Sequence, residues 1–157
     1  MKTPRQDDAT LHKMSEFLTN FDKGMAEMAV VSDMIMEQGK AKAGDTGLPE
    51  MEFDPQEGIS IAIPGNMMGF IKTPERYWQV VAYCMIRHFV LNALWHDEDQ
   101  LDLACDSFLR QTAERMKPRG IIARAWHRLT HRRNLALHYL QMFREGRQIY
   151  KEYQSLL

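Results

Sequence analysis

The chain has 157 residues, 45% hydrophobic and 26% charged, which is enough apolar material for the core of one ordinary domain. Nine glycines and six prolines are too few for a low-complexity chain, and two cysteines cannot form a disulfide framework. The net charge of −1 hides a division: residues 1–110 carry 18 acidic and 10 basic residues, and residues 111–157 carry 3 and 10. This division indicates either an anionic partner for the basic end or attraction between the two ends.

The N-terminal residues are polar and lack the apolar stretch of a secretory signal, so we expect a cytoplasmic protein. The predicted fold is mainly α: residues 1–157 form a single four-helix bundle-like domain. It has a long N-terminal heptad helix and a short β-hairpin insert at about residues 59–71.

Residues 7–41 carry the clearest helical pattern. Side chains recur at alternating spacings of three and four residues, as in the seam of a heptad repeat. The seam consists of Leu11, Met14, Leu18, Phe21, Met25, Met28, Ser32 and Ile35. Phe17, Val31 and Met36 widen the apolar stripe, which favours packing within a bundle, with a self-association surface as the alternative. Gly24 weakens the middle by about 1 kcal/mol relative to alanine, so a break there is a second alternative.

Residues 42–72 are predicted to be a loop followed by a hairpin. The first part, residues 42–58, mixes glycine, proline and acids without a period. Isoleucines then alternate with small residues, as in a strand, and Pro64-Gly65 suits the centre of a type II turn. The resulting hairpin over residues 59–71 must pack against other elements, because an isolated hairpin is only marginally stable.

Residues 73–95 form the predicted central helix. Thr73 is a suitable N-cap and Pro74 suits the first helical position. The helix that follows is apolar on nearly every side, which is typical of the buried centre of a bundle. A membrane span is disfavoured because the arginine within this helix would cost at least about 2.5–3.5 kcal/mol in a bilayer.

Arg87 and His88 are the unusual residues of this apolar helix. Buried charges need partners, and Asp102 or Asp106 on the next helix are the candidates for both residues. Such a pairing would be structural. If Arg87 and His88 instead face a cavity, they become the candidates for a ligand pocket.

Two further helices are predicted. Asp97 is expected to cap a helix over residues 98–116, and a turn at residues 117–120 ends it. Its inner side consists of Leu101, Cys105, Phe108, Thr112 and Met116. The last helix is predicted over residues 121–154, with an apolar stripe of Ile122, Trp126, Leu129, Ala136, Leu140, Phe143 and Tyr150. Short turns between helices favour antiparallel neighbours.

The basic face of the last helix is the most informative surface in the sequence. On a helical wheel, three histidines at positions 127, 131 and 138 lie roughly opposite the apolar stripe, beside arginines at i, i+4 and i+8. Arginine forks suit phosphate and carboxylate groups, so this basic strip is a candidate site for an anion or an acidic partner. Its residues are Arg124, His127, Arg128, His131 and Arg132. A solvated charged face is the alternative.

Two more specific interpretations of the basic strip have weaker support. The turn at residues 117–120 has the length of a helix-turn-helix connection, but the last helix is long for a recognition helix. His127 and His131 share a face as metal ligands do, but a third ligand is missing and the arginines would repel a cation. We therefore predict neither a metal site nor a cofactor.

The sequence contains no Gly-rich phosphate loop, nucleophile elbow, CxxC pair or HExxH motif. Cys84 and His88 have the i, i+4 spacing of a thiolate–imidazole pair, but a buried cysteine beside a core histidine is the favoured interpretation. No catalytic residue is predicted, and we do not expect an enzyme.

Three functions remain, from different classes. The leading hypothesis is a non-enzymatic helical interaction protein that acts through protein–protein contacts as an adaptor, regulator or assembly component, with homo-oligomers as one form. It rests on the heptad seam and on twelve methionines, which suit surfaces that repack against partners. The second is a nucleic-acid-binding regulator that uses the basic strip. The third is a small-ligand binder or enzyme with a pocket near Arg87 and His88. No membrane partner is expected.

Overall fold

Helices dominate the computed structural model, which describes residues 5–40, 47–54, 58–116, 120–122, 124–125 and 134–157. The elements in chain order are α1 (Asp8–Ala29), α2 (Ser32–Lys40), β1 (Glu50–Asp54), β2 (Gly58–Ala62), α3 (Gly65–Ile71), α4 (Pro74–Ala93), the 3-10 helix η1 (Glu98–Gln100), α5 (Leu101–Met116) and α7 (Leu135–Gln154). The predicted mainly helical, bundle-like fold with one antiparallel hairpin is confirmed.

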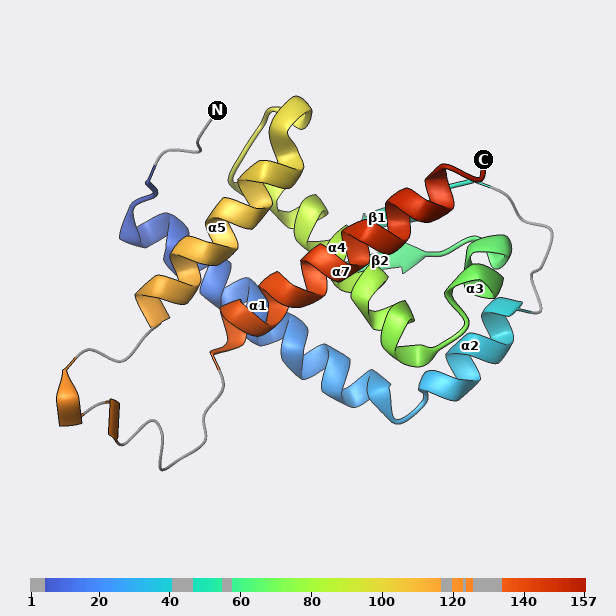
Figure 1. Cartoon of the computed structure of the whole chain (residues 1–157), viewed down its shortest axis with the longest axis horizontal. Helices are drawn as coiled ribbons and strands as arrows, with labels where there is room; N and C mark the ends of the chain where they lie inside the picture. Colours follow the sequence, from blue (N-terminus) through green and yellow to red (C-terminus); the bar gives the residue numbers. More distant parts are fainter. Residues whose placement is uncertain (1–4, 41–46, 55–57, 117–119, 123, 126–133) are drawn as a thin grey trace.

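Helix α4 forms the centre of the bundle and packs against α5 and α7 (Figure 1). The predicted start of this helix is confirmed: the Thr73 hydroxyl accepts a hydrogen bond from the Arg76 N–H at 3.3 Å, and Pro74 follows the cap. Nine of the twenty α4 side chains are buried, in keeping with its apolar sequence. Within the described residues, no helix has the length and hydropathy needed to cross a membrane.

The N-terminal helix is divided into two, which corrects the prediction of one helix over residues 7–41. Helix α1 continues through Gly24 to Ala29, so the alternative of a break at Gly24 is also wrong. The chain turns instead at Val30 and restarts as α2 at Ser32. The Ser32 hydroxyl donates to the Ala29 carbonyl at 2.8 Å and accepts from the Trp78 indole N–H at 2.9 Å. This pair of bonds ties the corner between α1 and α2 to α4.

The hairpin lies earlier in the chain than predicted. Strand β1 pairs antiparallel with β2, with Met51 opposite Ile61, so residues 50–54 are not a loop. The expected second strand is instead helix α3, and Pro64 is its N-cap rather than part of a turn. Helix α3 buries Met67, Met68 and Ile71, whose spacing fits one face of a helix.

The last helix begins at Leu135, which corrects the prediction of one helix over residues 121–154. Asn134 is the N-cap, with φ −75° and ψ 108°, and its side chain accepts from the Leu137 N–H at 3.2 Å. Its amide group also donates to the Ala113 carbonyl at 2.9 Å, which holds the start of α7 against α5. Because the backbone is extended at Asn134, one helical wheel does not describe both sides of it. The predicted alignment of His138 with the basic strip assumed one helix through Asn134, and that assumption is wrong.

Candidate functional site

Only the first half of the N-terminal heptad seam is fully buried inside the bundle. Its first three members, Leu11, Met14 and Leu18, are buried. The members that follow on α1 are more open: Phe21 and Met25 are half-buried, and the last is Met28, which is 46% exposed. The first half of the seam is thus buried within the bundle. In the second half, Phe21 and Met25 still touch Tyr139 of α7, but together with Met28 they line a space that no helix of the described chain fills.

This space is an apolar cleft of about 890 Å³ between α1 and α4, with strand β2 at one side. We call it the α1–α4 cleft. Most of its lining comes from the second half of the seam, its aromatic neighbours and one face of α4. The lining residues are Lys13, Glu16, Phe17, Asn20, Phe21, Gly24, Met25, Met28, Ile61, Tyr77, Trp78, Val81, Met85 and Phe89.

Aromatic rings form the walls of the α1–α4 cleft. Phe17 of α1 stacks on Phe89 of α4, with ring centroids 4.3 Å apart and an interplanar angle of 4°. Tyr77 and Trp78 meet edge to face at 4.9 Å. Packed aromatic rings hold a surface in one shape, whereas a methionine such as Met25 can adapt its side chain to a partner. The cleft therefore combines fixed walls with an adaptable end.

Two further exposed apolar side chains follow the cleft-lining residues in the chain, at the corner between α1 and α2. Met28 lies at the end of the cleft, and beyond it Val30 is 86% exposed and Met34 57% exposed. Apolar residues scattered singly on a surface need no explanation, so the candidate site is the cleft itself.

The α1–α4 cleft lies in the acidic part of the protein. Residues 7–38, which contain α1 and most of α2, carry seven carboxylates and two lysines. Only two of the lining side chains are charged, Lys13 and Glu16. A ligand of this cleft therefore binds an apolar surface on helices with a net negative charge, which favours a cationic partner.

A polar cluster lies where α4, α5 and α7 meet, and Asp102 of α5 is at its centre. Its carboxylate lies 2.8 Å from Arg87 Nε of α4 and accepts from Arg147 Nε of α7 at 3.0 Å. The Tyr83 hydroxyl donates to it at 3.0 Å, and burial raises the pKa of Tyr83, so this proton stays in place. The Arg87 Nε–H is not aligned for a hydrogen bond, and the contact is an ion pair. Asp102 is thus confirmed as the partner expected for Arg87.

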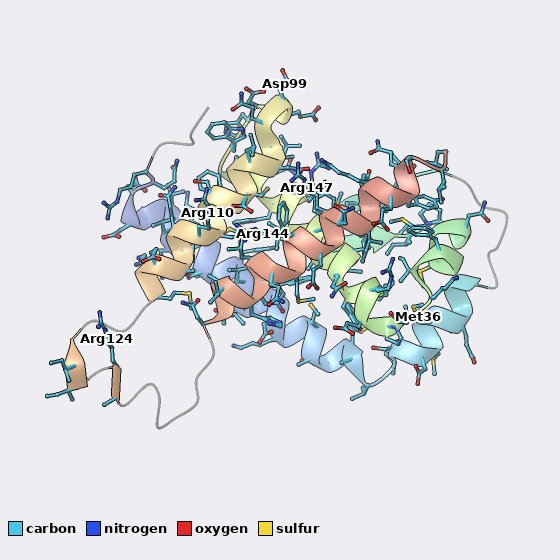
Figure 2. All side chains as sticks on the ribbon, in the orientation of Figure 1. Met36, Asp99, Arg110, Arg124, Arg144 and Arg147 are labelled. Carbon is cyan, nitrogen blue, oxygen red and sulfur yellow. The ribbon has the colours of Figure 1, made fainter. Side chains whose placement is uncertain are left out.

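Asp106, one turn along α5, repeats this arrangement. It accepts from Arg110 Nε at 2.9 Å and binds Arg144 through two nitrogens, Nε at 2.7 Å and a terminal nitrogen at 3.1 Å. Figure 2 shows Arg110, Arg144 and Arg147 on α5 and α7, with Arg124 lying apart from them. Each aspartate thus joins two arginines, and the cluster holds α4, α5 and α7 together.

The ion pairs of Asp106 predict acid-sensitive stability. Burial alone would raise the pKa of Asp106, but the hydrogen bonds and charges of Arg144 and Arg110 hold that pKa below its usual value. A carboxylate with a lowered pKa stabilises the fold above its unfolded pKa of about 4, and the contribution disappears as the pH falls through the folded value. We expect Asp106→Asn to lower the free energy of unfolding by about 1 kcal/mol at pH 7.

Urea titrations of both proteins at pH 7 and near pH 3 check this expectation. The difference between the wild type and the variant should be constant above about pH 5 and should shrink below about pH 4. A difference of the same size at both pH values would contradict the ionic origin of the contribution.

The predicted site residues lie in different places. Arg87 and His88 do not line the α1–α4 cleft; His88 is half-buried, with Nδ1 3.4 Å from the Asn92 amide nitrogen. Arg124 is exposed. The other members of the basic strip lie outside the described residues: His127, Arg128, His131 and Arg132.

The buried cysteines do not favour nucleophilic chemistry. Burial raises the pKa of the Cys84 thiol to about 12, although the charge of Arg87 opposes the rise. Cys105 is also buried, and burial raises its pKa too. Both thiols are therefore protonated at neutral pH, whereas a nucleophile needs the thiolate. Across the described residues, no group of three or more His, Cys, Asp or Glu side chains could hold a metal ion.

The sequence pattern identifies the α1 side of the α1–α4 cleft as an apolar stripe but does not indicate a cleft. Phe21, Met25 and Met28 belong to the predicted seam, but the α4 wall was assigned to the buried core as a whole. In comparisons with protein-family models, curated protein sequences and solved structures, nothing matches the chain.

Proposed function

We propose that this protein is a non-enzymatic helical interaction protein that binds a helical segment of a protein partner in the α1–α4 cleft. The observation that carries the proposal is the incompletely covered second half of the seam, because Phe21, Met25 and Met28 line the cleft. Phe21 and Met25 are only half-buried where they touch Tyr139 of α7, and Met28 is 46% exposed. Bundle helices bury such a stripe against a neighbouring helix. A helix from a partner supplies that neighbour.

The shape and lining of the cleft support a helix as the ligand. The lining of α1 runs from Lys13 to Met28, about four turns, and that of α4 runs from Tyr77 to Phe89. Two helices with a groove between them accept the apolar face of a third, which is one of the recurring modes of peptide recognition. Three methionines in the lining, Met25, Met28 and Met85, suit a ligand with irregular side chains.

Gly24 offers a test that blocks the cleft without harming the fold. It lines the cleft, and a Cβ built on it meets nothing within 4 Å. Gly69 of α3 is a matched control: it is exposed and helical, a Cβ on it also meets nothing within 4 Å, and it does not line the cleft. Arginine is a better helix former than glycine by about 1 kcal/mol, so neither Gly24→Arg nor Gly69→Arg should destabilise the protein.

We expect Gly24→Arg to weaken partner binding at least about tenfold and Gly69→Arg to leave it unchanged. The tagged wild-type protein first captures partners from an extract of the source cells, and mass spectrometry identifies them. Isothermal titration of one purified partner against the wild type and both variants then gives the affinities. Equal affinity of all three proteins for that partner would place the binding site away from the cleft and refute the proposal.

A further inference from the structure

The occupant of the α1–α4 cleft must combine an apolar helical face with positive charge. The apolar face follows from the aromatic and methionine lining, and the positive charge from the seven carboxylates and two lysines of residues 7–38. The chain itself contains a segment of this kind. We call it the 120–132 segment, and it follows α5.

Described parts of the 120–132 segment are unusually apolar and exposed. Ile121 is 86% exposed and Ile122 87% exposed, although both are large aliphatic side chains. The Arg124 N–H donates to the Gly120 carbonyl at 3.1 Å, the hydrogen bond of a helical turn. Exposed aliphatic pairs of this kind indicate a surface that a partner covers.

The sequence of the whole segment has the expected pattern. Apolar residues occur at positions 121, 122, 123, 125, 126 and 129, and basic residues at 124, 127, 128, 131 and 132. Spacings of three and four place all of these apolar residues except Ala123 on one face of a helix. No acidic residue lies between Glu114 and Glu145, so the segment is purely cationic.

We propose that the α1–α4 cleft binds the 120–132 segment of a second copy of this chain. The inference rests on the proposed function and names its partner. Among the described residues nothing covers the cleft, and Ile121 and Ile122 are exposed, so each copy offers both a receptor and a ligand. The acidic excess of residues 1–110 and the basic excess of residues 111–157 attract each other between copies. If each copy places its 120–132 segment in the cleft of the other, both clefts are filled in one two-fold symmetric dimer.

Two variants of the full chain separate the receptor from the ligand. Gly24→Arg fills the cleft and leaves the segment intact, while the double variant Ile121→Asp, Ile122→Asp destroys the apolar face and leaves the cleft intact. Both isoleucines are so exposed that their replacement should not disturb the fold. Gly69→Arg is the control, as above.

Sedimentation velocity over a range of protein concentrations gives the association state of each protein. The wild type and Gly69→Arg should form dimers as the concentration rises, and each cleft or segment variant should stay monomeric. An equimolar mixture of Gly24→Arg with the double isoleucine variant should recover dimers, because one intact cleft meets one intact segment. High salt should shift the wild type towards monomers.

A fluorescent peptide of residues 119–133 provides the second measurement. Its anisotropy should rise on titration with the double isoleucine variant, whose cleft is free, and should not rise with Gly24→Arg. A wild type that remains monomeric and does not bind the peptide would overturn the inference. If a captured partner still binds in a manner sensitive to Gly24→Arg, the proposed function survives and only the identity of the partner is wrong. A monomer that binds the peptide only after the isoleucines are replaced would assign the segment to its own chain and also overturn the inference.

Discussion

Gly146→Ala is expected to lower the free energy of unfolding by about 3 kcal/mol, one of the two largest effects we predict for single substitutions. Gly146 of α7 is buried where this helix crosses α4. A Cβ at this position would lie 2.0 Å from the Gln79 carbonyl oxygen and 2.9 Å from the Tyr83 Cβ. The first of these atoms belongs to the backbone of α4, so it cannot rotate away, and the two helices must separate to admit the methyl group.

The control for this prediction is Gly69→Ala in α3. A Cβ there meets nothing within 4 Å, so alanine should raise stability by up to about 1 kcal/mol through its better helix propensity. Urea unfolding followed by circular dichroism gives both free energies. If Gly146→Ala is as stable as the wild type, α4 and α7 do not approach as closely as the structure has them.

Asp102→Asn is expected to lower the free energy of unfolding by about 2–3 kcal/mol. Removing one partner of a fully buried ion pair costs about 3–5 kcal/mol, because the opposite charge is left uncompensated. The Asp102, Arg87 and Arg147 side chains are 20%, 31% and 38% exposed, so water screens part of this cost. The substitution leaves two half-buried guanidinium groups side by side without the carboxylate between them.

The matched control is Asp99→Asn on η1, where the aspartate is exposed and the same chemical change should alter stability by less than about 0.5 kcal/mol. Thermal and urea unfolding of the two variants and the wild type give the comparison. A second measurement tests the charge argument itself. Adding Arg147→Gln to Asp102→Asn should cost less than Arg147→Gln costs in the wild type, since one unpaired charge is removed. Strict additivity of the two substitutions would contradict an interaction through Asp102.

The sequence alone predicted the features that depend on neighbours in the chain. Thr73 and Pro74 predict the start of α4, and a nearly all-apolar sequence indicates that this helix is central. The pairing of Arg87 with α5 also followed, because a charge in an apolar helix needs a carboxylate within reach. Asparagine is one of the preferred N-cap residues, so Asn134 is a sequence signal for the start of α7 at Leu135.

The tertiary structure decided how far each local preference extends. The pattern of residues 7–41 is consistent with one helix, but the chain turns at Val30, where Ser32 bonds to Trp78 of a distant helix. In β1, Met51 and Phe53 alternate with acidic residues, and this period-two pattern is hidden in a charged segment until β2 lies beside it. Position 146 likewise must be glycine because the backbone of Gln79 lies against it, and Gln79 is too far away in the sequence for a local pattern to show this.

The candidate site shows the same division between local and tertiary information. The heptad spacing identifies Phe21, Met25 and Met28 as apolar positions of one helix face. Spacing cannot state what covers that face, because burial is a property of two surfaces and the sequence of one helix describes only one of them. Only the packed fold shows that the first half of the seam is buried, and that the second half touches α7 through Tyr139 and opens onto α4 as a cleft.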